Sequence, residues 1–468
     1  MLAFFFSPPG CCLVLPAAPL LILALAANVS ASTLSVGPGK QFATPCAAFQ
    51  SAADGDTVEI DAATAYAGDV CAFYKNHLTI RGVDGRPRIN AGGRNASEKG
   101  IWVVGGIGTI IENVDMSGAR SPNRNGAAIR LDGSHLTVRG SHFHDNENGI
   151  LTRNNAASNI VIENCEFASN GAGDGYSHNV YIGHVKSLVF KGNYSHDAHR
   201  GYNLKSRANV NTILYNRFSS STGQPAHEID LPAAGTAYVI GNVIQQPADH
   251  YNSTLISYGR EGVGNSADDL YVVNNTFLNN DSSSGSFIQI SDAVKTPAVV
   301  QNNLFIGTGI AVTQVNAIDR SNYKSLVAPV VDRANYDLHP LADSAVVKAG
   351  SSAGLSASGV DLNPAFQYKH IAGIEPRPVN GALSIGAYEP PAVPMAAALP
   401  AVEIQHIVTI AETPAEVPTA APASTFVITS ARTVAPTSVV QPAASTTANS
   451  WNRFAGWLAC LFLTEACK

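Results

Sequence analysis

The segments IVIENCEF (160–167), LVFKGNY (188–194) and TILYNRF (212–218) decide the fold, because all three share one pattern. Each is a short apolar, partly β-branched run that leads to Asn or Gly and then to a bulky side chain. Nine such segments occur, and their marker residues are Gly82, Asn113, Gly140, Asn164, Gly192, Asn216, Asn242, Asn275 and Asn302. The markers are 24 to 33 residues apart. A repeat of this length predicts the coils of a parallel β-solenoid.

The marker residues have a structural explanation. Each coil lays down two or three short strands that pair with the coils before and after it, and each corner needs a residue that tolerates left-handed backbone angles. Asn and Gly are the residues that adopt those angles most readily. We therefore expect the recurrent asparagines to form turns and stacked amides and to have no catalytic role.

A second set of strands lies between the markers, and examples are HNVYIGH, YNLKSRA, HEIDLP and TLISYG. Alignment of their inward apolar residues predicts one outward row that holds Tyr181, Lys205, Asp230, Ser257 and Gln289. The row beside it holds Asn179, Asn203 and Glu228. Arg207 lies one pleat repeat beyond Lys205. Adjacent coils pair about 4.8 Å apart, so these distant residues become neighbours.

The composition is that of a globular, turn-rich protein. The chain has 468 residues, 40 glycines, 26 prolines, 14% charged residues and a formal net charge of -6. It has no basic excess suited to nucleic acid, so nucleic acid is excluded as an expected partner.

The two ends of the chain differ from the repeats. Residues 1–31 contain the apolar stretch LLILALAA and a small-residue cleavage site, which predict a signal peptide, although no Lys or Arg precedes Lys40. Residues 390–450 predict a linker rich in Pro, Ala and Thr. Residues 451–468 form an apolar tail too short to span a bilayer. We expect a monomer that is secreted, periplasmic or on the cell surface, with membrane contact through the tail alone.

The remaining boundaries follow from the repeat. We expect residues 32–310 to form the solenoid and residues 311–389 to close it. QFATPCAAFQSAA (41–53) has the apolar spacing of a short helix that covers the first coil. In an oxidising compartment Cys46 and Cys71 are expected to form a disulfide, while Cys165 is expected to be a buried thiol.

Several stretches carry a family resemblance: DGDTVEIDA, DGYSHNVYIGH, NYSHDA, LKSRA, EIDLP, VIGNVIQQP and VVNNTF. With them the chain resembles secreted bacterial right-handed parallel β-helix proteins of the pectate-lyase-like superfamily, from about Leu34 to about Glu389. The resemblance implies a right-handed β-helix that processes polysaccharides, since better-known relatives include uronate lyases, epimerases and glycosidases. The Asn-Thr-Asp, Asp-Asp, Gly-His-Gly and Arg-Ile-Lys arrangement of the galacturonan hydrolases of this fold is found only in part, which disfavours hydrolysis.

A lyase or C5-epimerase that acts on an anionic, uronate-containing polysaccharide suits the outward row better. Such an enzyme removes a carbon-bound proton next to a carboxylate, and it needs a cation, a base and, in lyases, an acid. Lys205 is the expected base and Arg207 the expected carboxylate clamp. Tyr181 or His178 is the expected acid. The expected substrate-binding residues are Asn179, Asn203, Tyr202 and Tyr258.

Two acidic residues leave alternatives open. Glu228 and Asp230 are expected either to bind calcium, which takes several oxygen ligands, or to form ion pairs with Lys205 and Arg207. Ordinary exposed ion pairs would add well under about 1 kcal/mol to stability. In that case the chain would be a non-catalytic glycan-binding module or a structural solenoid.

Histidines at the coil corners form a further group. His196 and His199 have a spacing compatible with metal binding, but His144 follows Gly140 as His196 follows Gly192. We therefore expect a repeated corner histidine, with His196 and His199 as secondary candidates for a site.

Overall fold

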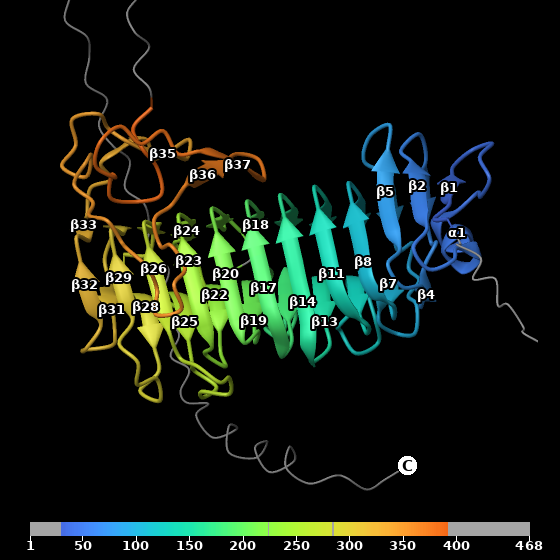
Figure 1. Cartoon of the computed structure of the whole chain (residues 1–468), viewed down its shortest axis with the longest axis horizontal. Helices are drawn as coiled ribbons and strands as arrows, with labels where there is room; N and C mark the ends of the chain where they lie inside the picture. Colours follow the sequence, from blue (N-terminus) through green and yellow to red (C-terminus); the bar gives the residue numbers. More distant parts are fainter. Residues whose placement is uncertain (1–29, 223, 283–284, 392–468) are drawn as a thin grey trace, which may run out of the picture. The chain divides into compact units, whose positions relative to one another are not determined.

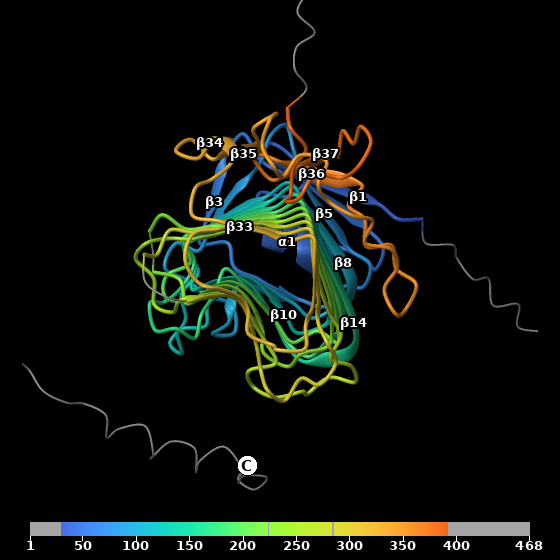
Figure 2. The ribbon, with the colours of Figure 1, turned by 90° about the vertical axis from the view of Figure 1, so that its left-hand side faces the viewer.

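A computed structural model describes residues 30–222, 224–282 and 285–391. The expected tail, all but the first two residues of the expected linker, and all but the end of the expected signal peptide lie outside these ranges. The described chain winds into a solenoid whose strands stack coil upon coil (Figure 1). Viewed end-on, the strands form three parallel sheets, which we name A, B and C (Figure 2).

Sheet A is made of strands β1 (Thr33–Val36), β2 (Thr57–Asp61), β5 (Thr79–Val83), β8 (Ile107–Glu112), β11 (Ser134–Arg139), β14 (Asn155–Glu163), β17 (Val185–Lys191), β20 (Val210–Leu214), β23 (Thr236–Ile240), β26 (Leu270–Val273), β29 (Val299–Gln301) and β32 (Ile318–Arg320).

Sheet B is made of strands β3 (Ala65–Ala67), β6 (Arg88–Asn90), β9 (Asp115–Ser117), β12 (His142–His144), β15 (Glu166–Ala168), β18 (Tyr194–His196), β21 (Arg217–Ser219), β24 (Val243–Gln246), β27 (Thr276–Asn279), β30 (Leu304–Ile306) and β33 (Tyr323–Ser325).

Sheet C is made of strands β4 (Cys71–Phe73), β7 (Gly100–Val104), β10 (Ala127–Leu131), β13 (Asn148–Thr152), β16 (Val180–Ile182), β19 (Tyr202–Ser206), β22 (His227–Leu231), β25 (Thr254–Tyr258), β28 (Ser286–Ile290) and β31 (Ile310–Val312).

Aromatic side chains fill the interior of the middle coils. Phe143, Phe167 and Phe218 point inward from sheet B, and Ser195 takes the same position on the strand between the last two. Phe190, from sheet A, lies between Phe167 and Phe218, with ring centroids 6.1 and 5.8 Å away. All these side chains are fully buried, and each Phe contributes about 1.5–3 kcal/mol to stability. A small residue on one sheet thus makes room for a large one on another.

The marker asparagines occupy two neighbouring corner positions. Asn113, Asn164 and Asn302 are themselves left-handed, with φ between 53 and 56°. The position after the left-handed residue carries a buried amide ladder, formed by Asn193, Asn216, Asn242, Asn275, Asn303 and Asn322. Each side-chain amide in the ladder donates to the next at 2.9–3.1 Å. The geometry supports the turn and amide-stacking roles expected from sequence.

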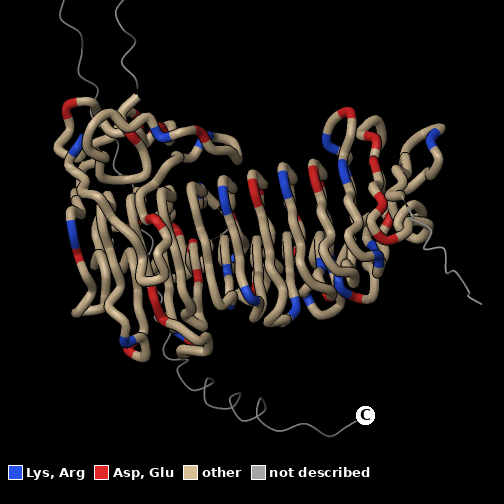
Figure 3. The backbone as a smooth tube through the Cα atoms, viewed as in Figure 1, with Lys and Arg blue, Asp and Glu red and all other residues tan. Residues whose placement is uncertain are grey.

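A column of alternating charge ends the strands of sheet A, and it is visible as alternating blue and red coils in Figure 3. Register pairs its members Glu59, Arg81, Glu112, Arg139, Glu163 and Lys191 in that order. Arg139 lies 3.0 Å from Glu163 and 3.6 Å from Glu112. These pairs are partly exposed and add little stability, but a register slip would separate the opposite charges.

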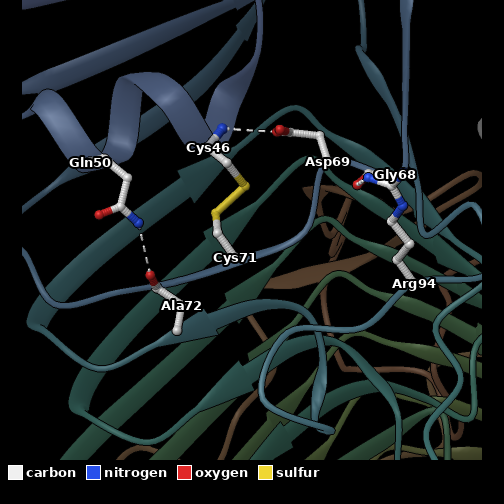
Figure 4. Close-up of a disulfide and its surroundings, with 7 residues drawn as sticks. All are labelled: Cys46, Gln50, Gly68, Asp69, Cys71, Ala72 and Arg94. Atoms are coloured by element: carbon white, nitrogen blue, oxygen red, sulfur yellow. Dashed lines mark hydrogen bonds between the residues drawn. A yellow bond between two sulfur atoms is a disulfide. The ribbon is translucent and has the colours of Figure 1, made fainter.

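The N-terminal end of the solenoid is covered as expected. Helix α1 (Pro45–Ser51) packs Phe49 against Phe73 and Trp102, with ring centroids 4.7 and 5.1 Å away. The predicted Cys46–Cys71 disulfide is present and joins α1 to β4, across 25 residues of sequence (Figure 4). A bond of this kind fits an oxidising compartment. Cys165 is a buried free thiol, also as predicted.

The region expected to close the solenoid is divided in two. The three sheets continue past residue 310 to β33, so the last coil ends at Ser325. The following residues, up to 391, turn back over sheets A and B (Figures 1 and 2) and carry two hairpins. The hairpins are β34 (Val330–Asp332) with β35 (Asp337–Pro340), and β36 (Phe366–Lys369) with β37 (Gly373–Pro376).

This returning segment, residues 326–391, is tied to several coils. The amide of Ala365 donates to the Tyr215 hydroxyl at 3.1 Å, and that of Ala387 donates to the Thr276 hydroxyl at 2.9 Å. Leu362 packs in an apolar cluster with tyrosines of sheet A. The segment therefore fastens earlier coils to one another from outside. None of the helices in the described residues is long and apolar enough to cross a membrane.

Candidate functional site

The outward row predicted on sheet C is present in the predicted register. Consecutive strands pair Tyr181 with Lys205, Lys205 with Asp230, Asp230 with Ser257 and Ser257 with Gln289. Leu204 points inward and is fully buried. The repeat spacing thus predicted correctly which side chains of five coils become neighbours.

Lys205 and Arg207 converge on one carboxylate. The Lys205 ammonium lies 3.1 Å from one oxygen of Glu261, and the Arg207 guanidinium donates to the other oxygen. Glu261 belongs to the loop between β25 and β26, whose backbone is tied to the turn after β22 by a 2.9 Å hydrogen bond from the Glu261 amide to Pro232. Partial burial raises the pKa of Glu261, but the charges of Lys205 and Arg207 outweigh burial and hold the pKa below its ordinary value.

Three further side chains frame the two cations. Asp230 lies 3.4 Å from the Lys205 ammonium. The Arg207 guanidinium donates to the Tyr181 hydroxyl at 3.1 Å. The Tyr202 ring lies 4.9 Å from the Lys205 nitrogen, and burial, with the charges of Asp230 and Glu261, raises the pKa of Tyr202 to about 12. Tyr202 therefore keeps its proton and forms an aromatic wall of the cluster.

His178 lies behind this cluster in a buried position. Its Nδ1 accepts a 3.1 Å hydrogen bond from the Tyr202 amide, so the proton of the neutral ring is on Nε2. Burial, with the charges of Lys205 and Arg207, lowers the pKa of His178 well below its ordinary value. The ring stacks on Tyr202 at 4.7 Å. A neutral buried imidazole of this kind supports the cluster from behind and is poorly suited to the role of acid that the sequence predicted.

The row beside the cluster is buried, contrary to the exposure that a substrate-binding or metal-binding role requires. Asn179 and Asn203 are fully buried, and their amides link Asn170 to Glu228 in a continuous ladder. Burial raises the pKa of Glu228 to about 8, so its carboxyl group is mainly protonated at neutral pH. These residues hold coils together, because a polysaccharide cannot reach side chains enclosed in the solenoid.

Tyr258, the last residue expected to bind substrate, is also enclosed. It is fully buried, and its hydroxyl donates to the Gly235 carbonyl at 2.6 Å. Because Ser257 beside it points outward, strand alternation sends Tyr258 inward. The expectation of substrate contact at this residue conflicts with the strand geometry.

Two depressions flank the cluster along sheet C. One, of about 370 Å³, lies over β10, β13 and β16 and is lined by Arg130, Arg153 and Tyr181, among others. The other, of about 430 Å³, lies over β25 and β28 and includes Arg260 and Gln289. The sheet order places the cluster between the two depressions. A linear polymer that crosses the strands would meet basic side chains in both depressions and in the cluster between them.

Sequence reasoning missed four of these basic and acidic residues, namely Arg130, Arg153, Arg260 and Glu261. Arg130 belongs to the same outward row, through pairing of Arg130 with Leu151 and of Leu151 with Tyr181, so extension of the alignment would have found it. Arg153 comes directly after β13 of the same sheet. Glu261 lies in an irregular loop, and no repeat signal marks it.

The calcium site expected at Glu228 and Asp230 does not fit their surroundings. Calcium takes six to eight oxygen ligands, whereas Glu228 is enclosed and Asp230 faces the Lys205 ammonium. The one group of three or more His, Cys, Asp and Glu with metal-binding spacing in the described ranges lies on sheet B. A calcium requirement stays a prediction for experiment.

Comparison with known families agrees with this architecture. Residues 78–244 match a family model described as a right handed beta helix region. The fold is a right-handed parallel β-helix. The right-handed β-helix fold expected from the sequence is thereby confirmed.

Solved structures give the same result. The β-helix resembles the crystal structure of pectate lyase Pel9A with a TM-score of 0.54 and 14% identity, over 78% of this chain and 98% of that one. An alginate lyase from Paenibacillus sp. str. FPU-7 shares 12% identity (TM-score 0.34; 63% and 98% covered). Pectin methylesterase PemA from Erwinia chrysanthemi shares 13% (TM-score 0.34; 62% and 92% covered). The comparison with curated proteins gave no match.

Proposed function

We propose that this β-helix processes a uronate-containing polysaccharide on the outer face of sheet C, as a lyase or a C5-epimerase. One observation carries the proposal: Lys205 and Arg207 hold a single carboxylate, that of Glu261, between them. A uronate carboxylate has the same chemistry as the Glu261 side chain and would replace it in the same place. The similarity in fold to a pectate lyase supports the substrate class.

The chemistry explains why two cations are useful. Removal of the C5 proton leaves an electron pair that moves into the adjacent carboxyl group, and cations at that group stabilise the charge that develops. In a lyase the pair then forms a C4–C5 double bond and expels the 4-oxygen substituent, which takes up a proton. In an epimerase a proton returns to the opposite face of C5.

The side chains around the clamp supply these roles. Arg207 offers a planar pair of donors and holds the uronate carboxylate. Once Glu261 is displaced, Lys205 keeps one acidic neighbour, Asp230. In its neutral amine form it takes the C5 proton as the base, and the ammonium that results stabilises the charge on the carboxyl group. The Tyr181 hydroxyl, which accepts a hydrogen bond from Arg207, is placed to return a proton.

The flanking depressions provide a path for the polymer. Together with the cluster they span seven strands, from β10 to β28, and the six spacings between these strands correspond to roughly 29 Å. Arg130 and Arg153 on one side and Arg260 on the other would attract further uronates. Binding along this length would place one sugar at Lys205.

A second candidate function is glycan binding without chemistry. It is favoured by the ion pairs that hold Lys205 between Asp230 and Glu261, since a lysine so engaged serves as a cation. Such a module would bind the same polymers at the same face.

The test is a screen of the purified protein against anionic polysaccharides, with and without calcium. Unsaturated uronate absorbance identifies a lyase, deuterium incorporation at C5 in heavy water identifies an epimerase, and saturable binding with neither identifies a binding module. Arg207→Ala should abolish the signal. Lys186→Ala, an exposed lysine on sheet A, is the matched control and should keep it. Equal activity in both variants would refute the proposed site.

A further inference from the structure

A second cluster of functional groups lies on the outer face of sheet B, away from the proposed polysaccharide site. Asp115 begins β9, and His142 and His144 lie on β12, one coil later. Strand register pairs His142 directly with Asp115. His142 and His144 are two residues apart and share the outward face, so both imidazoles lie beside one carboxylate.

The distances within this cluster are short. His142 Nδ1 lies 3.0 Å from one oxygen of Asp115, and His144 Nε2 lies 3.2 Å from the other. One ligand atom from each residue falls within 4.8 Å of the others. Zinc bonds of about 2.1 Å in a tetrahedral arrangement place neighbouring ligand atoms about 3.4 Å apart. The ligand atoms are therefore close enough for small side-chain movements to bring all three around one ion.

The ring orientations favour ligation. His144 Nδ1 lies 2.7 Å from the carboxylate of Asp145, which leaves Nε2 directed at Asp115. A metal-binding histidine commonly donates its other ring nitrogen to a carboxylate in this way. His142 Nε2 is buried without a hydrogen-bond partner, so the polar contact of this ring in the described structure is made through Nδ1.

We propose that Asp115, His142 and His144 bind a divalent first-row transition metal ion of the zinc class. Two imidazoles and one carboxylate suit such ions, whereas calcium and magnesium prefer oxygen ligands. The three side chains are 21–27% exposed, so a further position at the ion is open to water or to an oxygen of a bound molecule. The proposal does not depend on the polysaccharide site of sheet C.

The same arrangement recurs two coils later and lacks one ligand. Glu166, Tyr194, His196 and Asp197 take the places of Asp115, His142, His144 and Asp145. His196 contacts Asp197 at 2.6 Å and Glu166 at 3.4 Å, and its ring stacks on Tyr194 as His144 stacks on His142. With a phenol in place of the second imidazole, this second copy has one histidine and one acid. It provides an internal control.

The experiment measures zinc binding by equilibrium dialysis and calorimetry on the full chain, without a polyhistidine tag and after treatment with a chelator. The unmodified protein should bind one zinc ion. His142→Ala and His144→Ala should each weaken binding by more than a hundredfold, while Asp145→Asn, which removes only the carboxylate behind His144, should weaken it about 10- to 100-fold. His196→Ala should leave binding unchanged.

Two further readouts separate ligation from a merely structural role. Cobalt in place of zinc should give visible absorption bands in the unmodified protein and none in His144→Ala. Tyr194→His should add a second, weaker zinc site at the later coil. Zinc affinity that is undetectable in the unmodified protein, or the same in folded His144→Ala, would overturn the proposal.

Discussion

Two polar rows run along sheet C in the same register, two residues apart in each strand, yet their environments are opposite. In the outer row Lys205 lies between the buried carboxylate of Asp230 and the half-exposed carboxylate of Glu261, whereas Asn203 and Glu228 of the inner ladder are enclosed. Ser220, from the corner that precedes the next strand, accepts a hydrogen bond from Asn203 and helps to enclose it. Strand alternation thus decides the direction of a side chain, and the adjoining corner decides whether water reaches it.

The comparison is tested first by Lys205→Ala, for which we expect the largest effect. Turnover should fall about a hundredfold or more, because the base and one cation are lost. The free energy of unfolding should also fall, by about 1–3 kcal/mol, because the 5% exposed carboxylate of Asp230 loses its cation. Paired measurements of turnover and urea unfolding check this. Full turnover with lowered stability would reverse the roles assigned to the two rows.

The inner ladder should lose stability without losing turnover in Asn203→Ala. This variant removes the link between Asn179 and Glu228 and leaves buried polar groups without partners, at a cost of about 2–3 kcal/mol. Thermal and urea unfolding should show the loss, while the folded fraction should retain nearly normal turnover. Asn76→Ala, at an exposed hydrogen-bonded asparagine, is the control and should cost much less.

Glu228 should make stability depend on pH. Its folded-state pKa is raised to about 8, above the ordinary value near 4.5, so the unfolded state binds fewer protons than the folded state between these values. Stability from this group should therefore fall as pH rises from about 5 to 8, by at most about 1.4 kcal/mol per pH unit. In Glu228→Gln this pH-dependent contribution to stability should vanish. Unfolding curves at several pH values test this, and an unchanged slope in the variant would argue against a protonated Glu228.

The smallest expected effect is that of Glu261→Ala. This variant tests whether the outer row can bind a ligand or is only a closed network of ion pairs. Glu261→Ala removes the carboxylate that occupies the clamp, so oligouronates should bind a few-fold more tightly. Affinity measured by calorimetry should rise most at low ionic strength, where charges are least screened. Weaker binding would instead show that Glu261 contacts the glycan.

The repeat made most of the architecture predictable. Its spacing located the stacked row from Tyr181 to Gln289, and the apolar pattern of QFATPCAAFQSAA located α1. These features are set by contacts between successive coils, which a periodic sequence records directly.

The rest of the site depends on irregular parts of the chain. The burial of Asn203 comes from corner residues, and the clamp partner Glu261 comes from a loop outside the repeat. The pairing of Asp115 with His142 depends on the register of sheet B. The sequence analysis compared the corner histidines with one another but did not align the strands of this sheet. The inward direction of the Tyr258 side chain could have been predicted from strand alternation alone.

The returning segment, residues 326–391, changes how this solenoid should come apart. A simple solenoid has contacts between neighbouring coils alone and can fray from either end, coil by coil. Here hydrogen bonds from Ala365 to Tyr215 and from Ala387 to Thr276 join coils across 150 and 111 residues. The coils beneath the segment must therefore unfold cooperatively, as a single block. Hydrogen exchange should show one common opening rate for that block and independent, faster opening in the coils that precede it.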